Sequence, residues 1–91
     1  MEKVKNVVGS SRFPAPSSYS SWLDYWEKQT GESATYCGKC GIFVFAEVGA
    51  HVQKVYGTDK RYYITPLCRS CNQRTDEFYV TTKLVPVPSN L

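Results

Sequence analysis

The sequence has no long hydrophobic run. No apolar stretch approaches the roughly 20 residues with which a helix crosses a bilayer, and the opening MEKVKNVVGSS is too polar for a secretory signal peptide. We therefore expect an intracellular, cytoplasmic protein with no membrane partner. In that compartment thiols stay reduced, so paired cysteines more often hold a metal than form disulfides.

The chain also lacks internal repeats beyond its paired cysteines, and it is short. Its 91 residues fit a single domain, and a domain of this size buries only about 60–65% of the surface that its unfolded chain exposes. The content of 42% hydrophobic and 14% aromatic residues is nevertheless that of a globular protein. Small domains of this kind often need a crosslink to be stable, which draws attention to the four cysteines.

These cysteines form two CxxC pairs with 27 residues between them: Cys37, Cys40, Cys68 and Cys71. Two CxxC pairs at such a separation are typical of zinc sites, and Gly38 and Gly41 relieve strain in the first loop. Four thiolates at about 2.3 Å saturate the ion and leave no position for water, so the expected role is structural. Disulfides or an iron–sulfur site are the alternatives, whereas a thioredoxin-like redox site would need one pair in a βαβ context.

Three regions are expected along the chain: an extended arm at 1–19, a zinc-binding domain at 20–80, and a tail at 81–91. The arm contains Pro14 and Pro16, which exclude a helix there. The tail alternates apolar residues with prolines, which predicts an edge strand and a loose terminus.

SSWLDYWEKQTGE predicts a short helix between an N-cap at Ser21 and a stop at Gly31. Three of its aromatic residues recur at helical spacing and share one face: Trp22, Tyr25 and Trp26. We expect this face to pack on the domain. The alternative is that it forms a platform for nucleic-acid bases.

The segment after the first cysteine pair predicts strands and then a second helix. IFVFAEV has the length and composition of a strand that ends at Gly49, and HVQKV continues as a strand or loop. A turn at 57–59 precedes a second strand at 61–65, which Pro66 closes. LCRSCNQRTDEFYV then predicts a helix of two to three turns, with the second cysteine pair in its first turn.

The predicted order of elements resembles that of a treble-clef zinc finger: a zinc knuckle formed by the first CxxC pair, then strands, then a helix that carries the second pair. In particular, GAHV at 49–52 and YITPLCRSCNQR at 63–74 resemble the HNH, or ββα-metal, endonuclease family. The resemblance covers roughly residues 36–78. It implies a small α+β fold with an HNH-like zinc module, made of knuckle, β-hairpin and helix, to which the aromatic helix is added.

By position, the resemblance implies that His51 is the general base of a phosphodiesterase and that Asn72 is a ligand of a catalytic Mg²⁺ or Mn²⁺. The aspartate that precedes this histidine in the family is Ala50 here, so the catalytic metal site is degenerate. Three interpretations of His51 and Asn72 stay open. They form a catalytic pair, a vestige of a nuclease site, or a structural pair that ties strand to helix.

The overall charge of +3 is mild, but its distribution favours one region. Residues 51–74 contain five basic residues and only one acidic residue, Asp59. The basic residues are candidates for phosphate contacts: Lys54, Lys60, Arg61, Arg69 and Arg74. A solvated charged face is the simpler explanation.

The sequence thus predicts a structural-zinc domain that binds DNA or RNA, or a nucleic-acid-associated partner, without catalysis. The first alternative is an active HNH-type endonuclease with His51 as base. The second is a protein-interaction module that never contacts nucleic acid.

Overall fold

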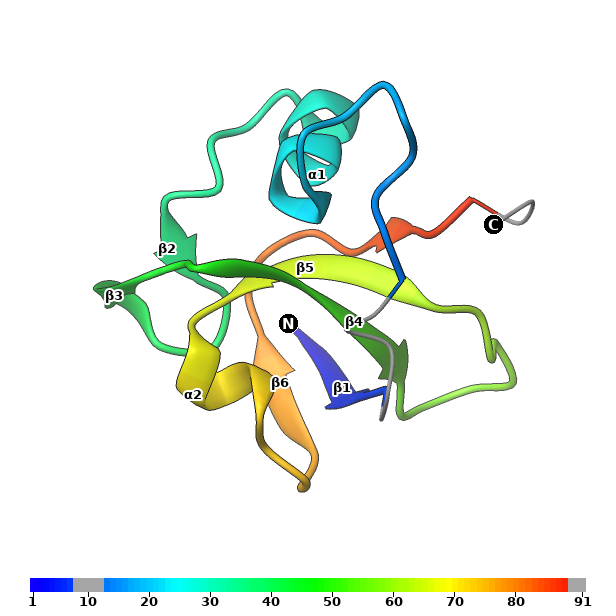
Figure 1. Ribbon diagram of the computed structural model, residues 1–91. Coiled ribbons are helices and arrows are strands. Elements are labelled where there is room, and N and C mark those ends of the chain that lie inside the picture. The colour runs from blue at the N-terminus through cyan, green and yellow to red at the C-terminus, as the bar shows by residue number, and fades with distance from the viewer. Residues whose placement is uncertain (8–12, 89–91) are drawn as a thin grey trace.

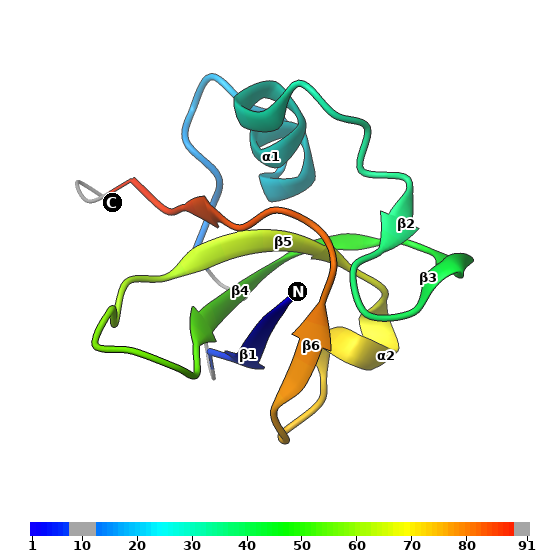
Figure 2. The same ribbon diagram turned by 180° about the vertical axis from the view of Figure 1, so that it is seen from behind.

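The computed structural model describes residues 1–7 and 13–88, so parts of the expected arm and tail (8–12 and 89–91) lie outside the described residues. The chain forms a small α+β structure with two helices and antiparallel strands, in the order β1 (Glu2–Asn6), α1 (Trp22–Thr30), β2 (Tyr36–Cys37), β3 (Gly41–Phe45), β4 (Val48–Lys54), β5 (Tyr63–Leu67), α2 (Arg69–Asn72), β6 (Phe78–Val80) and β7 (Val85–Pro86). Figures 1 and 2 show these elements from opposite sides.

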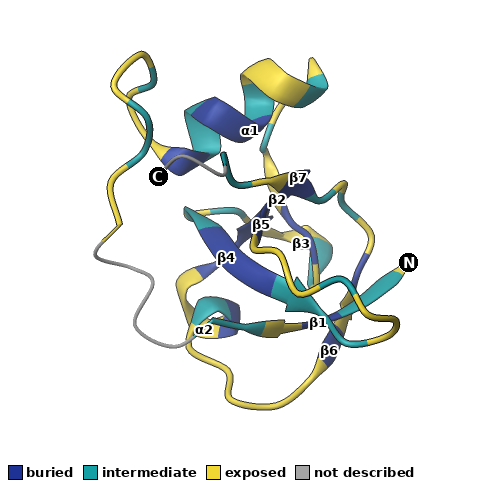
Figure 3. Ribbon diagram, turned by 90° about the vertical axis from the view of Figure 1, so that its right-hand side faces the viewer, coloured by how far each residue is buried: buried dark blue, intermediate teal, exposed yellow. Residues whose placement is uncertain are grey.

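A five-stranded sheet organises the molecule, with the strand order β6-β1-β4-β5-β7. The remaining strands, β2 and β3, form a separate hairpin. Helix α1 lies on one side of the sheet and α2 on the other (Figure 3). Each side has its own cluster of buried apolar residues, one containing three of the cysteines and the other containing the tryptophans.

The expected N-terminal arm contains an interior strand of this sheet. Strand β1 lies between β6 and β4 and is antiparallel to both, with Val4 opposite Phe78 on one side and Lys54 on the other. Val4 is fully buried. Backbone groups of an extended segment need partners once they are buried, and two neighbouring strands supply them here.

Helix α1 confirms the prediction in its start, its end and its buried face. The Ser21 hydroxyl accepts a hydrogen bond from the Asp24 amide at 3.0 Å, and Gly31 ends the helix in the left-handed region with φ 74°. The aromatic face packs against residues of β5 and β7 in one buried cluster: Trp22, Tyr25, Trp26, Ile64 and Val85. The rings of this face are therefore core residues and offer no platform for bases.

Two strand boundaries differ from the expectation. IFVFAEV does not form one strand, because β3 ends at Phe45 and β4 begins at Val48, so that Gly49 lies inside β4. A Cβ at Gly49 would lie 2.7 Å from the Cβ of Trp22. Glycine at this position therefore allows α1 to approach the sheet closely and does not mark the end of a strand. Pro66 also lies inside β5, opposite Gly49, and its carbonyl accepts a hydrogen bond from the Gly38 amide at 2.8 Å.

The prediction of a long second helix is wrong. Helix α2 comprises only residues 69–72, and Phe78–Val80 forms strand β6. Phe78 and Val80 are buried and Tyr79 between them is exposed, which is the alternation of a strand with one face toward a core. Pairing with β1 therefore overrides the helical expectation for this segment.

The last strand, β7, pairs with β5 at one edge of the sheet. Within residues 1–7 and 13–88, no helix has the length and apolar character needed to span a membrane.

Candidate functional site

The four cysteines converge although they come from distant parts of the chain. Cys37 is in β2, Cys40 follows it in the hairpin turn, Cys68 is the N-cap of α2 and Cys71 lies within α2. All four sulfurs lie within 4.8 Å of one another, and those of Cys40 and Cys71 are 3.6 Å apart. A tetrahedron with metal–sulfur bonds of about 2.3 Å has sulfur–sulfur edges of about 3.8 Å. The cluster can therefore hold a metal ion, and all four cysteines are free thiols.

Contacts with two other segments hold the loop that carries the first pair. The Gly38 carbonyl accepts a hydrogen bond from the Thr81 amide at 3.0 Å. A Cβ at Gly38 would overlap the hydroxyl of Thr82 and lie 3.1 Å from the Pro66 carbonyl, so only glycine fits. Gly41, at φ 74°, supplies the left-handed turn before β3. The chain between β6 and β7 thus supports the metal site from outside the CxxC pattern.

The pKa values of Cys37 and Cys71 are shifted in opposite directions: that of Cys37 is lowered and that of Cys71 is raised. Burial raises the pKa of Cys37, but hydrogen bonds from the amides of Cys40, Cys68 and Lys39 outweigh it and bring the value to about 7 from 9.0. Burial raises the pKa of Cys71, and hydrogen bonds with the other cysteines raise it further. Cys37 is therefore partly deprotonated near neutral pH, and a bound cation would stabilise the thiolate form of all four cysteines.

His51 and Asn72 lie around one cleft of about 700 Å³. The cleft is bordered by the start of α1, by β4 and by the end of α2, and its lining includes Asn6, Trp22, Glu47, His51, Asn72 and Arg74. Both residues that the HNH resemblance singles out thus border this cleft, although the His51 ring packs against Trp22 of α1 and Asn72 belongs to α2, on the other side of the sheet.

The environment of His51 is apolar. Only 5% of its surface is exposed, and its ring lies edge-on to Trp22, with centroids 4.9 Å apart, and to Phe13, at 6.3 Å. Burial lowers its pKa below 6.5, which favours the neutral imidazole at pH 7. Its Nε2 atom is buried without a hydrogen-bond partner.

The carboxylates near the cleft are engaged in ion pairs: Glu47 lines the cleft and pairs with Arg69 at 3.5 Å, and Asp76 and Glu77 pair elsewhere. Asp76 and Glu77 lie in the segment that joins α2 to β6. Asp76 pairs with Arg74 at 2.6 Å, and Glu77 pairs with Lys3 of β1 at 3.5 Å. Neither lines the cleft, and Ala50 occupies the position of the family aspartate. Across the described residues, the four cysteines are the one group of three or more cysteine, histidine or acidic side chains with metal-binding geometry.

Asn6 is a site residue that the sequence did not reveal. Its amide nitrogen donates to the carbonyls of Cys71, at 2.9 Å, and Arg74, at 3.0 Å, across 65 and 68 residues of sequence. Its Oδ1 atom, like Nε2 of His51, is buried without a partner. No local pattern marks Asn6, because its role depends on where β1 enters the sheet.

The five basic candidates do not form a single patch. Lys54, Lys60 and Arg61 lie near one end of the β4–β5 hairpin, whereas Arg69 and Arg74 follow its other end, where Val48 faces Leu67. Each arginine forms an ion pair with a carboxylate: Arg61 with Asp59 at 3.2 Å, Arg69 with Glu47 at 3.5 Å and Arg74 with Asp76 at 2.6 Å. These pairs reduce the positive charge that the arginines offer to a ligand.

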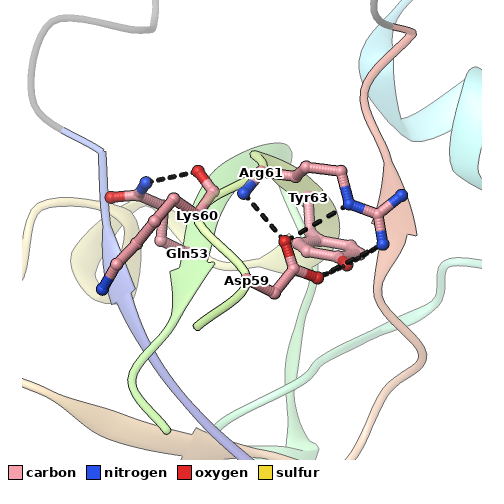
Figure 4. Close-up of polar contacts among 5 residues, drawn as sticks. All are labelled: Gln53, Asp59, Lys60, Arg61 and Tyr63. Carbon is pink, nitrogen blue, oxygen red and sulfur yellow. Dashed lines mark hydrogen bonds and ion pairs between the residues drawn. The ribbon is translucent and has the colours of Figure 1, made fainter. Parts of the chain in front are cut away.

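Figure 4 shows the hairpin end in detail. The guanidinium of Arg61 bridges Asp59 and the hydroxyl of Tyr63, and its hydrogen bonds hold the pKa of Asp59 well below 3.8. The Lys60 carbonyl accepts a hydrogen bond from the side chain of Gln53 at 2.7 Å, which fixes the loop to β4. Arg61 thus stabilises the turn.

A second cationic surface appears where α1 does not cover the sheet. Helix α1 contacts β4, β5 and β7, and the face of β1 that bears Lys3 and Lys5 remains accessible. The Lys3 ammonium lies 5.7 Å from the ring centroids of both Tyr56 and Tyr79, which are 61% and 47% exposed. A hydrogen bond with Tyr56 raises the pKa of Tyr79 above 10.0, so the two phenols are neighbours.

Comparison with known proteins finds no matching family model, curated protein or solved structure. The HNH resemblance therefore rests on the motif residues alone.

Proposed function

We propose that this chain is a treble-clef, HNH-like binding domain held together by one structural zinc ion, and that it binds single-stranded nucleic acid inside the cell. Four clustered thiols suit zinc, which prefers sulfur ligands in a closed tetrahedral site. The order of knuckle, β4–β5 hairpin and α2 with Cys68 at its start supports the treble-clef assignment.

The observation that carries the binding proposal is the position of Lys3 between two exposed tyrosines. Proteins that bind single strands combine cations for the phosphates with aromatic rings on which bases stack. Tyr56 and Tyr79 supply rings. Lys5 is exposed and supplies charge on the same face of β1 as Lys3, which also pairs with Glu77 at 3.5 Å. Gln53, opposite Lys5 on β4, adds a donor and an acceptor. This face replaces the arginine-rich region as the main candidate surface.

A titration of labelled single-stranded DNA and RNA, followed by fluorescence anisotropy, tests the proposal. We expect affinity to fall linearly with the logarithm of salt concentration, as for binding that releases counterions from phosphates. Tyr79→Ser should weaken binding about 5- to 150-fold, because loss of one stacked base costs about 1–3 kcal/mol. Lys3→Ala with Lys5→Ala should weaken binding and also flatten the salt dependence.

Arg69→Ala is the matched control, because Arg69 is an exposed cation of α2, which the Asn6 face of β1 contacts, not the face that bears Lys3 and Lys5. We expect nearly unchanged affinity for this variant. Equal affinities for wild-type protein and the Tyr79→Ser variant, or no salt-dependent binding by the wild type, would contradict the proposal.

The shared cleft of His51 and Asn72 favours a metal-dependent endonuclease as the second candidate. Its test is incubation with plasmid and Mg²⁺ or Mn²⁺. The leading proposal predicts no cleavage, whereas cleavage that His51→Ala abolishes would establish the nuclease.

A further inference from the structure

The β2–β3 hairpin carries the longest run of consecutive exposed large apolar side chains among the described residues. All four residues from Ile42 to Phe45 are exposed, at 73%, 86%, 37% and 69%. Tyr36, opposite Phe45, is 43% exposed and stacks on it with centroids 5.8 Å apart. Neither face of β3 contacts a core, although antiparallel hairpins commonly bury one face.

The hairpin also has an unprotected edge. Strand β3 pairs with β2 on one side, and no other strand in the described part of the chain joins this two-stranded sheet. Natural proteins protect such edges with charged residues, proline or bulges that turn the edge away. Between Cys40 and Ala46 the sequence has neither charge nor proline, although the register with β2 shifts between Tyr36 and Cys37, so that residues 42–44 bulge and have no partner in β2. Figures 1 and 2 show β3 at the periphery, projecting beyond α2 and the main sheet.

We propose that this hairpin is the contact surface of a homodimer, in which β3 of one copy pairs antiparallel with β3 of a second copy about a twofold axis. An isologous contact of this kind brings each residue of the strand close to the same strand of the partner. Because side chains 42–45 are all apolar, any antiparallel register places apolar groups against apolar groups. The surface is thus complementary to itself.

The exposed area is sufficient for such a contact. Since a buried aromatic side chain covers about 150–250 Å², the exposed fractions of Tyr36 and residues 42–45 together correspond to about 600 Å² per chain. Two copies therefore offer at most about 1,200 Å² of exposed side-chain surface, and its complete burial would reach the lower end of the range for specific interfaces. The main chain and the rim of the hairpin add to this area.

Oligomeric state measured by size-exclusion chromatography with light scattering, from micromolar to near-millimolar protein, tests the proposal. Wild-type protein should have the mass of two chains at high concentration. Phe43→Glu should have the mass of one chain under the same conditions, with a dissociation constant at least a hundredfold higher. Tyr62→Glu changes an exposed aromatic residue away from the hairpin and should remain dimeric.

Metal content and far-UV circular dichroism verify that each variant is folded. Should Phe43→Glu fail to fold, Ile42→Lys tests the same contact. Amide NMR spectra of the wild type should show their largest changes on dilution at residues 41–45. A wild-type protein that is monomeric at every concentration, or a folded hairpin variant that still dimerises, would overturn the proposal, whatever other proteins the hairpin binds.

Discussion

The side-chain amide of Asn6 donates a hydrogen bond to the main-chain carbonyl of Cys71 at 2.9 Å. This contact joins the first strand of the sheet to the helix region that carries Cys68 and Cys71, two of the four clustered cysteines. The second bond from the same amide, to Arg74, holds the chain just after that helix. The N-terminal strand therefore supports the cysteine cluster as well as the sheet.

Replacing Asn6 by alanine should lower the free energy of unfolding by about 1–3 kcal/mol, because partly buried carbonyls lose their donor. Urea unfolding of the metal-loaded protein measures the effect. Lys5→Ala, at an exposed position of the same strand, is the control and should change stability by no more than about 0.5 kcal/mol. Equal stabilities of the two variants would show that the contact with Cys71 contributes nothing.

Gly49→Ala should destabilise the packing of α1 on the sheet. The new methyl would lie 2.7 Å from the Cβ and main-chain carbon of Trp22, so the helix must move. We expect a loss of about 1–3 kcal/mol, as for other overpacked positions, together with a shift in tryptophan emission. Thr58→Ala in the exposed β4–β5 connection should cause neither change. An unaltered emission spectrum in the glycine variant would contradict this account of Gly49.

Removal of the metal should unfold the domain. A structural zinc site contributes on the order of 10 kcal/mol in small peptides, and the cysteines are part of the core cluster that also contains Val4 and Leu67. We expect one zinc per chain by elemental analysis and loss of near-UV circular dichroism on chelation. Cys71→Ser should behave like the chelated protein. A chain that remains folded without metal would refute the structural role.

Acidification should lower the free energy of unfolding, in part because His51 is buried. Because burial lowers its pKa in the folded protein below 6.5, the unfolded state takes up the proton first as pH falls through 6.5. The contribution of His51 to stability is therefore complete above that pH and is lost progressively below it. Urea titrations on both sides of pH 6.5 should show a steeper decrease for wild type than for His51→Phe.

Metal content must be followed in the same samples, because acid also protonates thiolates. Identical pH profiles for wild type and the His51→Phe variant at equal metal content would contradict the assignment of a neutral, buried histidine.

Local sequence determined the elements whose signals lie within a few residues. Ser21, Gly31 and the aromatic spacing between them specify the bounds and the buried face of α1, because capping and helical periodicity are short-range effects. The CxxC spacing likewise identified the four thiols that cluster. The sequence also predicted a helix with Cys68 and Cys71 in its first turn, but the predicted length of that helix was wrong.

Tertiary structure decided the features that depend on pairing between distant segments. Residues 2–6 form an interior strand because β4 and β6 both pair with them, and Phe78–Val80 becomes a strand because β1 supplies its partner. The roles of Asn6 and Gly49 follow from those pairings and from the docking of α1. Composition and periodicity could not show that the arginines pair with carboxylates while Lys3 lies between two exposed tyrosines, because these contacts exist only once the sheet has formed.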